Sequence, residues 1–194
     1  MSAIYVFLLI LLIVIIAVFI KVQNTNVIYV KSDLDKQYYL VRDLNDKQQA
    51  SNILAKIKQN ILGLTEYLKQ NIGKYPEYRD YIEQLASRIK NVEVLESTED
   101  SVYTSYSVNK GEQIVFCLRS RHIHNQIHKF NLLMYVVLHE MSHVACPEYG
   151  HTLLFKKIFA FITTIAIQLG LYSKIDFGQN AEEYCGLMIT DSII

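Results

Sequence analysis

The chain opens with an uninterrupted run of apolar residues. Residues 3–20 carry no charge and no helix-breaking residue, and as a helix they would rise roughly 27 Å, close to the thickness of a bilayer core. A cleaved signal peptide is the alternative, but no basic residue precedes the run and no small-residue cleavage site lies before Lys21. The pattern therefore predicts an uncleaved transmembrane anchor over residues 1–20.

The charges that flank this run predict an orientation. Lys21 and Lys31 follow the run, whereas the short segment before it has no Lys or Arg. By the positive-inside rule, this asymmetry favours a single-pass membrane protein with a cytosolic C-terminal domain.

After the run, the pattern alternates between strands and helices. β-Forming residues at 27–30 and 38–41 flank a turn-like segment, so we expect a linker and β-hairpin over residues 21–45. Beyond Asp46, helical spacing predicts one helix ending near Gly73 and a second starting after Pro76. Their apolar faces should pack on the domain's own core; they comprise Ile53, Ile57, Ile61, Leu64 and Leu68, and Tyr78, Ile82, Leu85 and Ile89.

The second half repeats this alternation. Residues 102–108 and 113–118 are rich in β-formers and predict a second hairpin, whose edge would hold an extended peptide unless another segment covers it. Residues 158–172 form another apolar run, which is short for a membrane span. We expect a buried core helix there rather than a second membrane segment, and a short helix over residues 181–189.

Composition narrows the class of protein. The chain has 19 basic and 19 acidic residues among 194, so no basic excess favours nucleic-acid binding. Its cysteines, Cys117, Cys146 and Cys185, are scattered and do not form a disulfide framework. We expect them to be reduced and buried, which favours a cytosol-facing domain.

The chemistry is concentrated in the HExxH segment from His139 to His143. Two histidines four residues apart lie on one face of a helix, so both can bind one metal ion, and Glu140 can reach a water on that ion. The preceding residues 132–138 are apolar on every side, which predicts a buried helix, with Asn131 as its N-cap. Unpaired polar groups are costly in such a helix, and a metal supplies the missing partner.

The third ligand is expected to be His151. Pro147 ends the helix and Gly150 permits a sharp turn directly before this histidine. The alternative is Glu182 or Glu183, as in zinc sites built from two histidines and one glutamate.

All six histidines lie between His122 and His151. The spacing of His122, His124 and His128 matches no standard metal site. A solvated loop is therefore the simpler interpretation of these three, and a second metal site or a set of substrate contacts is the alternative.

The elements His139-Glu140-x-x-His143 and Gly150-His151-x-x-x-Phe155 resemble the SprT-like and WLM metallopeptidases. Residues 106–112 and 184–186 also resemble the WLM-type peptidases of large DNA viruses. The resemblance covers roughly residues 100–190. It implies a zincin-like domain in which His139, His143 and His151 bind zinc and Glu140 is catalytic. The apolar run at the N-terminus departs from the cellular members.

The expected protein has an α+β fold: a transmembrane anchor over 1–20, a linker and β-hairpin over 21–45, and a compact zincin-like metallopeptidase domain with helices and a small antiparallel sheet over 46–194. It would be a membrane-anchored zinc metallopeptidase acting on a protein or peptide, with its catalytic domain in the cytosol or the virion interior. Glu140 would activate the water.

Two points stay open at this stage. Tyr149 and Tyr184 are both candidate donors to the oxyanion of the reaction. The alternative function is a non-catalytic membrane protein with a structural zinc site, in which Cys146 would supply a fourth ligand.

Overall fold

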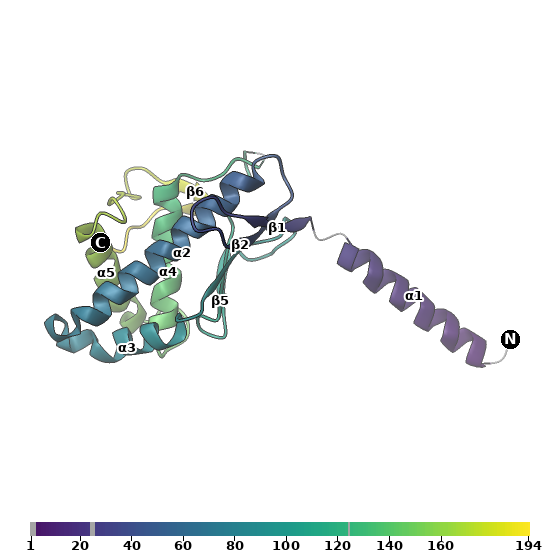
Figure 1. Cartoon of the computed structure of the whole chain (residues 1–194), viewed down its shortest axis with the longest axis horizontal. Coiled ribbons are helices and arrows are strands. Elements are labelled where there is room, and N and C mark those ends of the chain that lie inside the picture. Colours follow the sequence, from purple (N-terminus) through teal and green to yellow (C-terminus); the bar gives the residue numbers. More distant parts are fainter. Residues whose placement is uncertain (1–2, 24–25, 124) are drawn as a thin grey trace.

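The computed structural model describes residues 3–23, 26–123 and 125–194 and has an α+β fold (Figure 1). The described residues form five α-helices: α1 (Ala3–Gln23), α2 (Lys47–Gln70), α3 (Arg79–Arg88), α4 (Phe130–Ala145) and α5 (Leu153–Gln168). Short 3-10 helices, η1 (Ile72–Lys74) and η2 (Pro76–Tyr78), join α2 to α3. The strands are β1 (Val27–Lys31), β2 (Tyr38–Arg42), β3 (Glu93–Glu96), β4 (Ser105–Val108), β5 (Gln113–Phe116), β6 (Glu182–Tyr184) and β7 (Leu187–Ile189).

Helix α1 contains the N-terminal apolar run, extends away from the rest of the chain and exposes the side chains of residues 4–16 (Figure 1). Among the described residues, no helix combines the length and the apolar character needed to cross a membrane. The predictions of a transmembrane anchor and of a single-pass membrane protein are therefore wrong; residues 1–2 of that prediction lie outside the described residues.

The central sheet has three strands in the order β3-β5-β4. β4 and β5 form the predicted antiparallel hairpin, and its turn contains Asn109, Lys110 and Gly111, all with positive φ. β3 pairs in parallel with β5, so the sheet is mixed, not purely antiparallel as expected. Sequence reasoning missed β3 because a four-residue strand with a glutamate at each end carries little β signal.

The helices pack against this sheet and against one another. α2 contacts β2 and β3, whereas α4 contacts β4, α3 and α5. α4 lies in the centre of the core, and residues 132–138 are all buried, as their pattern predicted. α5 buries Ile158, Phe159, Ile162 and Ile165, which confirms a core helix. The predicted faces of α2 and α3 are also buried, at Ile57, Ile61, Leu64 and Leu68, and at Ile82, Leu85 and Ile89.

The N-terminal hairpin is confirmed, because β1 and β2 pair antiparallel over their whole length. The end of α2 differs from the expectation. The helix stops at Gln70 with Asn71 as its C-cap, and the Asn71 side chain donates a hydrogen bond to the Tyr67 carbonyl. Gly73 lies beyond this cap, in η1.

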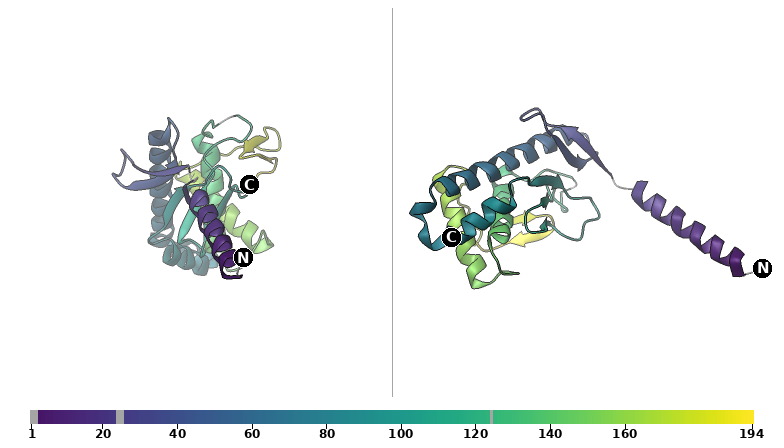
Figure 2. Two further views of the ribbon diagram at one scale, coloured as in Figure 1. Left: turned by 90° about the vertical axis from the view of Figure 1, so that its right-hand side faces the viewer. Right: turned by 60° about the horizontal axis from the view of Figure 1, so that its bottom comes forward.

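The C-terminal segment is a hairpin, not the expected helix over residues 181–189. β6 and β7 pair antiparallel on either side of Cys185 and Gly186, both of which have positive φ. Two consecutive positive φ angles are typical of a type I′ hairpin turn, so the turn geometry overrides the weak helical pattern. This hairpin lies beside α4 in both views of Figure 2.

A disulfide joins this hairpin to the segment after β5. Cys117 and Cys185, separated by 68 positions, are bonded, and only Cys146 is a free and buried thiol. The expectation of three reduced cysteines is therefore wrong for this pair. The disulfide removes the part of the expectation of a cytosol-facing domain that rested on reduced cysteines.

Candidate metal centre

The first two candidate ligands are positioned by α4. His139 and His143 are one helical turn apart and half-buried, while the residues between and before them anchor the helix in the core. The N-cap of the helix is Lys129 rather than the predicted Asn131, and the helix begins at Phe130. The Asn131 side chain instead exchanges hydrogen bonds with the backbone of Ser173, which ties the segment after α5 to the first turn of α4.

The end of α4 is fixed by side chains from other elements. Pro147 disfavours helical geometry at Cys146, and the helix ends at Ala145. The last helical carbonyls, Val144 and Ala145, accept hydrogen bonds from Gln84 on α3, and Arg88 also donates to Val144. These contacts satisfy carbonyls that a helix end leaves unpaired.

The loop that follows is held by Lys110 from the β4–β5 turn. The Lys110 ammonium donates hydrogen bonds to the carbonyls of Cys146, Pro147 and Glu148 at 2.9, 3.2 and 3.3 Å. Gly150 then adopts a φ of 77°, which reverses the chain directly before His151. The turn predicted from Pro147 and Gly150 is therefore present, and it returns the chain to α4.

Helix α5 starts immediately after His151. The Thr152 side chain accepts a hydrogen bond from the Phe155 backbone N–H, an ordinary N-cap. The Phe155 ring stacks on the His143 ring, with centroids 4.2 Å apart, and its centroid lies 5.0 Å from that of His139. Phe155 thus packs α5 against the motif helix, as its spacing predicted.

The three histidines converge on one point. The Nε2 atoms of His139, His143 and His151 form a triangle in which each pair is 3.1 Å apart. One ring nitrogen carries at most one proton, so these atoms cannot satisfy one another in all three pairs. Among the described residues, this is the only group of three or more His, Cys, Asp or Glu side chains close enough to hold a metal ion.

The electrostatics of the cluster keep its lone pairs available. Burial, together with the neighbouring His143 and His151, lowers the pKa of His139 to about 3. Burial, together with the neighbouring His151 and Lys110, also lowers the pKa of His143 to about 4. Both rings are therefore neutral at neutral pH, which is the form that binds a metal.

Glu140 lies beside this cluster and is 4% exposed. Burial raises the pKa of Glu140 to about 7, and a hydrogen bond from the Ser105 side chain opposes this rise. Ser105 is on the edge strand β4, so its hydrogen bond to Glu140 connects this strand to the motif helix. A carboxyl group with a pKa near 7 can both accept and release a proton at neutral pH.

The cluster and Glu140 open into one cavity of about 560 Å³. β4 and the β6–β7 hairpin form its other wall, through residues that include Ser105, Ser107, Tyr184 and Leu187. β4 is an edge strand, since β5 pairs with one of its sides and no described strand pairs with the other. The outer edge of β4, which could hold an extended peptide if no other segment covers it, therefore borders the cavity.

Comparisons with known proteins place the chain among viral proteins. It is 48% identical over 174 residues to the uncharacterized protein R325 of Acanthamoeba polyphaga mimivirus, across 90% of this chain and 88% of that protein. The chain belongs to the R325 family. No protein-family model matches it. No solved structure matches it either.

Two further relatives of this R325-family protein share shorter stretches with it. Uncharacterized protein 136R of invertebrate iridescent virus 6 is 38% identical over 71 residues, which are 36% of this chain and 39% of that protein. Uncharacterized protein 042R of invertebrate iridescent virus 3 is 37% identical over 101 residues, which are 50% of this chain and 55% of that protein. These names assign no activity, so the peptidase prediction rests on the site itself.

The other predicted residues of the R325-family chain lie outside the metal cluster. Glu182 pairs with Lys129 at 3.1 Å, and Glu183 accepts hydrogen bonds from the Ser120 hydroxyl and the Gly186 backbone N–H. His128 accepts a hydrogen bond from the Cys185 backbone N–H. Neither it nor His122 joins the cluster, and His124 lies outside the described residues.

Sequence reasoning missed two residues that shape the site. Ser105 reaches Glu140 from a strand 35 positions earlier, and Lys110 clamps the loop that carries His151. A serine in an edge strand and a lysine in a hairpin turn are ordinary surface residues, so no local signal distinguishes them. Only the register of β4 against β5 and the packing of α4 beside it bring them to the site.

Proposed function

We propose that this protein is a zinc metallopeptidase. The observation that carries the proposal is the convergence of three histidine nitrogens beside a buried glutamate, in a cavity bordered by an unpaired strand edge. The resemblance of the HExxH and Gly-His elements to the SprT-like and WLM metallopeptidases supports the same activity.

The donor set fits zinc. In a tetrahedral zinc site with Zn–N bonds of about 2.0–2.1 Å, neighbouring nitrogens are about 3.3 Å apart. The three Nε2–Nε2 distances are each 3.1 Å, so the rings need to move apart by only a small amount. Three neutral imidazoles are a donor set that zinc accepts in catalytic sites, where a fourth position stays open to water or substrate.

When bound, zinc would lower the pKa of a water and polarise the scissile carbonyl. Glu140 would accept a proton from the attacking water and then pass it to the departing amine nitrogen. The Ser105 hydroxyl orients the carboxylate for this task by donating a hydrogen bond to it. In the metal-free site, burial raises the pKa of Glu140 to about 7, which makes this carboxyl a stronger proton acceptor than an exposed glutamate.

The shape of the cavity favours an extended peptide as the substrate. Residues 104–107, which include most of β4, line the cavity, and the outer edge of this strand is unpaired within the described chain. An extended peptide adds to such an edge through main-chain hydrogen bonds, and alternate side chains then point to opposite faces. This mode would bring one peptide carbonyl past the three histidines.

A structural zinc site is less well supported. Such a site usually takes four protein ligands, often with cysteine among them. The metal cluster contains three histidines and no fourth ligand from the described residues, and the free thiol of Cys146 is buried outside it. A buried glutamate adjoining the cluster also has no purpose in a closed site.

The experiment that tests this proposal compares Glu140→Gln with wild type on fluorescein-labelled unfolded casein. Glutamine has nearly the same shape but cannot accept the proton, so turnover should fall by about 10²–10⁴-fold. Zinc should stay bound, because Glu140 is not one of the clustered ligands. Glu77→Gln, at an exposed position on η2, is the matched control. Equal turnover in Glu140→Gln and wild type would refute the proposed role of Glu140.

A further inference from the structure

Tyr184 on β6 carries an unpaired hydroxyl into the cavity. The residue is 3% exposed, and its hydroxyl has no hydrogen-bond partner among the described residues. It lines the cavity together with His139, His143 and Glu140. Burial and the Glu140 carboxylate raise the pKa of this hydroxyl, whereas the Ser105 side chain and the Cys117 backbone lower it, so the hydroxyl faces Glu140 across the cavity.

The unpaired hydroxyl distinguishes Tyr184 from Tyr135, the other buried tyrosine that lines the cavity. Tyr135 also lines the cavity, but its hydroxyl accepts a hydrogen bond from the Ile193 backbone N–H at 3.2 Å and lies 3.4 Å from the Asp191 carbonyl. A buried polar group without a partner is costly, and most such groups in folded proteins are paired. The Tyr184 hydroxyl is therefore free to form a hydrogen bond with a ligand that enters the cavity.

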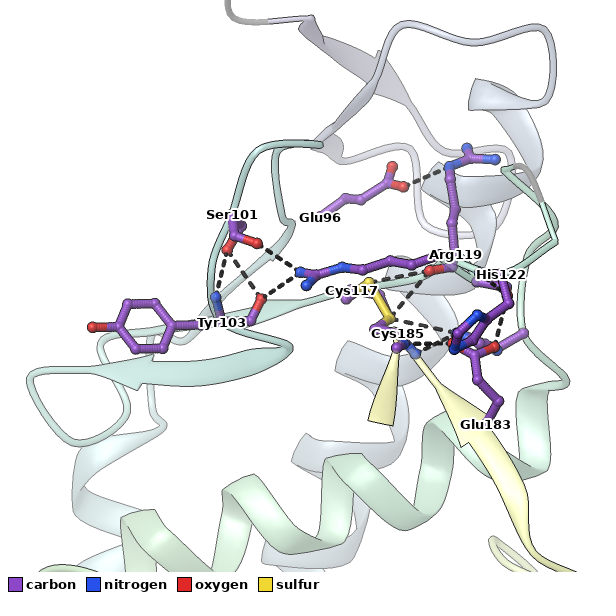
Figure 3. Close-up of a disulfide and its surroundings, with 12 residues drawn as sticks. Glu96, Ser101, Tyr103, Cys117, Arg119, His122, Glu183 and Cys185 are labelled. Atoms are coloured by element: carbon purple, nitrogen blue, oxygen red, sulfur yellow. Dashed lines mark hydrogen bonds and ion pairs between the residues drawn. A yellow bond between two sulfur atoms is a disulfide. The ribbon is translucent and has the colours of Figure 1, made fainter. Parts of the chain in front are cut away.

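Several contacts hold Tyr184 in this place. The adjoining Cys185 is bonded to Cys117 at the end of β5, and Figure 3 shows this disulfide beside Glu183. Glu183 accepts hydrogen bonds from Ser120 and from Gly186, and the Cys185 backbone N–H donates to His128. The residues on both sides of Tyr184 are thus fixed to the segment that follows β5, and the ring has little freedom to move.

We propose that Tyr184 is a catalytic residue of the peptidase, an inference that rests on the proposed function. As water oxygen bonds to the carbonyl carbon, the electron pair of the C=O π bond moves onto the carbonyl oxygen. Glu140 takes the proton released by the water. The Tyr184 hydroxyl donates a hydrogen bond to the oxygen that gains the charge, and it keeps its own proton. A donor aimed at developing charge in a desolvated site is worth far more than one in water.

Tyr149 is the other tyrosine whose position near the motif suits this role, and the structure disfavours it. Its side chain is 85% exposed, and it is not among the residues that line the cavity. Its ring lies 4.2 Å from the Lys110 ammonium, on the outer side of the loop that Lys110 holds. Tyr149→Phe keeps this contact and removes only the hydroxyl, so it is a matched control.

The test measures zinc-loaded Tyr184→Phe, Tyr149→Phe and wild type on fluorescein-labelled unfolded casein. Tyr184→Phe should lower kcat by about 10²–10³-fold with little change in KM, as for the loss of one oxyanion donor. Tyr149→Phe should match wild type. The melting temperature of metal-free Tyr184→Phe should be unchanged or higher, because the lost hydroxyl has no partner in the fold. Tyr135→Phe, which removes a paired hydroxyl, should lower it.

Binding of a tetrahedral analogue gives a readout that does not depend on turnover. Zinc-loaded wild type and Tyr184→Phe are titrated calorimetrically with the phosphinic peptide acetyl-Ala-ψ(PO2–CH2)-Ala-amide. Its phosphinate oxygens occupy the places of the reacting water and the charged carbonyl oxygen. The variant should bind it about 10–100-fold more weakly, the worth of one hydrogen bond to a charged group.

The outcomes separate the two proposals. Wild type that neither cleaves casein nor binds the phosphinic peptide would refute the peptidase, and the role of Tyr184 would fall with it. Active wild type together with an equally active Tyr184→Phe that binds the phosphinic peptide equally well would overturn the role of Tyr184 alone. A lower melting temperature in Tyr184→Phe with unchanged kcat would assign Tyr184 a structural role instead.

Discussion

The two sides of the cavity are built in different ways. The metal side, which consists of His139, Glu140 and His143 on α4 together with His151 and Phe155, comes from one stretch of 17 residues. The opposite wall consists of β4 and the β6–β7 hairpin, which are far apart in the sequence and are joined through β5 and the Cys117–Cys185 disulfide. One side is therefore a local arrangement, and the other depends on the fold as a whole.

This difference assigns separate tasks to the two sides. The metal side supplies three nitrogens and the proposed general base, and its geometry follows from one helix, one turn and the start of the next helix. The opposite wall supplies the strand edge, the Ser105 hydroxyl that contacts Glu140, and the unpaired Tyr184 hydroxyl. Changes to the three histidines should therefore remove the metal, whereas changes to Glu140 or on the opposite wall should leave it bound and impair turnover.

The largest effect should come from His151→Ala, on the metal side. The variant loses one of three clustered nitrogens, so zinc affinity should fall by more than the about 10–100-fold seen when an outer partner of a metal site is lost. Glu182→Gln and Glu183→Gln, on the opposite wall, should stay within about 10–100-fold of wild type. Competition with a chromophoric chelator measures all of these affinities, and His122→Ala is the matched control. If His151→Ala bound zinc as tightly as wild type while Glu182→Gln or Glu183→Gln lost zinc, the third ligand would be a glutamate of the opposite wall and not His151.

The next effect concerns the disulfide that anchors the opposite wall. Replacing Cys117 and Cys185 by serine releases a loop of 68 positions in the unfolded chain, which should lower the free energy of unfolding by about 4 kcal/mol. Urea denaturation followed by circular dichroism measures this difference. Cys146→Ala, at the free buried thiol, should cost only about 1 kcal/mol.

The zinc affinity of the same double cysteine variant shows whether the metal side depends on the opposite wall. Its zinc affinity should stay close to that of wild type, since neither cysteine belongs to the metal cluster. A loss of zinc as large as that in His151→Ala would show that the metal side is not an independent local structure.

A smaller effect should appear in the pH dependence of stability without metal. Burial raises the pKa of Glu140 from 4.5 to about 7. Between these values the folded chain binds a proton that the unfolded chain does not, so this contribution to stability is present below about pH 4.5 and is lost as the pH rises through about 7. Glutamine does not titrate, so metal-free Glu140→Gln does not lose stability in this way as the pH rises. It should exceed wild type by roughly 2–3 kcal/mol at about pH 8, and the difference should shrink toward about pH 4.5.

Urea denaturation across this pH range measures the difference, with Glu77→Gln as the control for removing an exposed carboxylate. A constant difference between Glu140→Gln and wild type at every pH would mean that Glu140 titrates normally, and that the opposite wall does not desolvate it.

The same contrast explains what the sequence predicts and what it leaves out. The motif helix, its break at Pro147, the turn at Gly150 and the packing of Phe155 all follow from neighbouring residues, and each is present. The hairpins β1–β2 and β4–β5 and the core helix α5 are also local patterns. The grouping of His139, His143 and His151 follows from these elements.

The predictions that are wrong needed information from outside the segment. The C-terminal helix was expected from nine residues, but pairing of β6 with β7 and the bond from Cys185 to Cys117 favour a hairpin. β3 was missed because its partner β5 lies about 20 positions later. The transmembrane anchor was expected from an apolar run alone, and no helix of the described chain meets the length and apolar character of a span.

The central claim is that three histidines bind zinc and that Glu140 acts as the general base for the water that hydrolyses the peptide bond. The most direct measurement takes the full chain after metal-replete expression, determines zinc by mass spectrometry, and follows cleavage of labelled unfolded casein with and without chelator. The account predicts one zinc per chain, cleavage that chelation abolishes and added zinc restores, and no cleavage by Glu140→Gln. A chain without stoichiometric zinc, or cleavage that persists after complete removal of the metal, would contradict it.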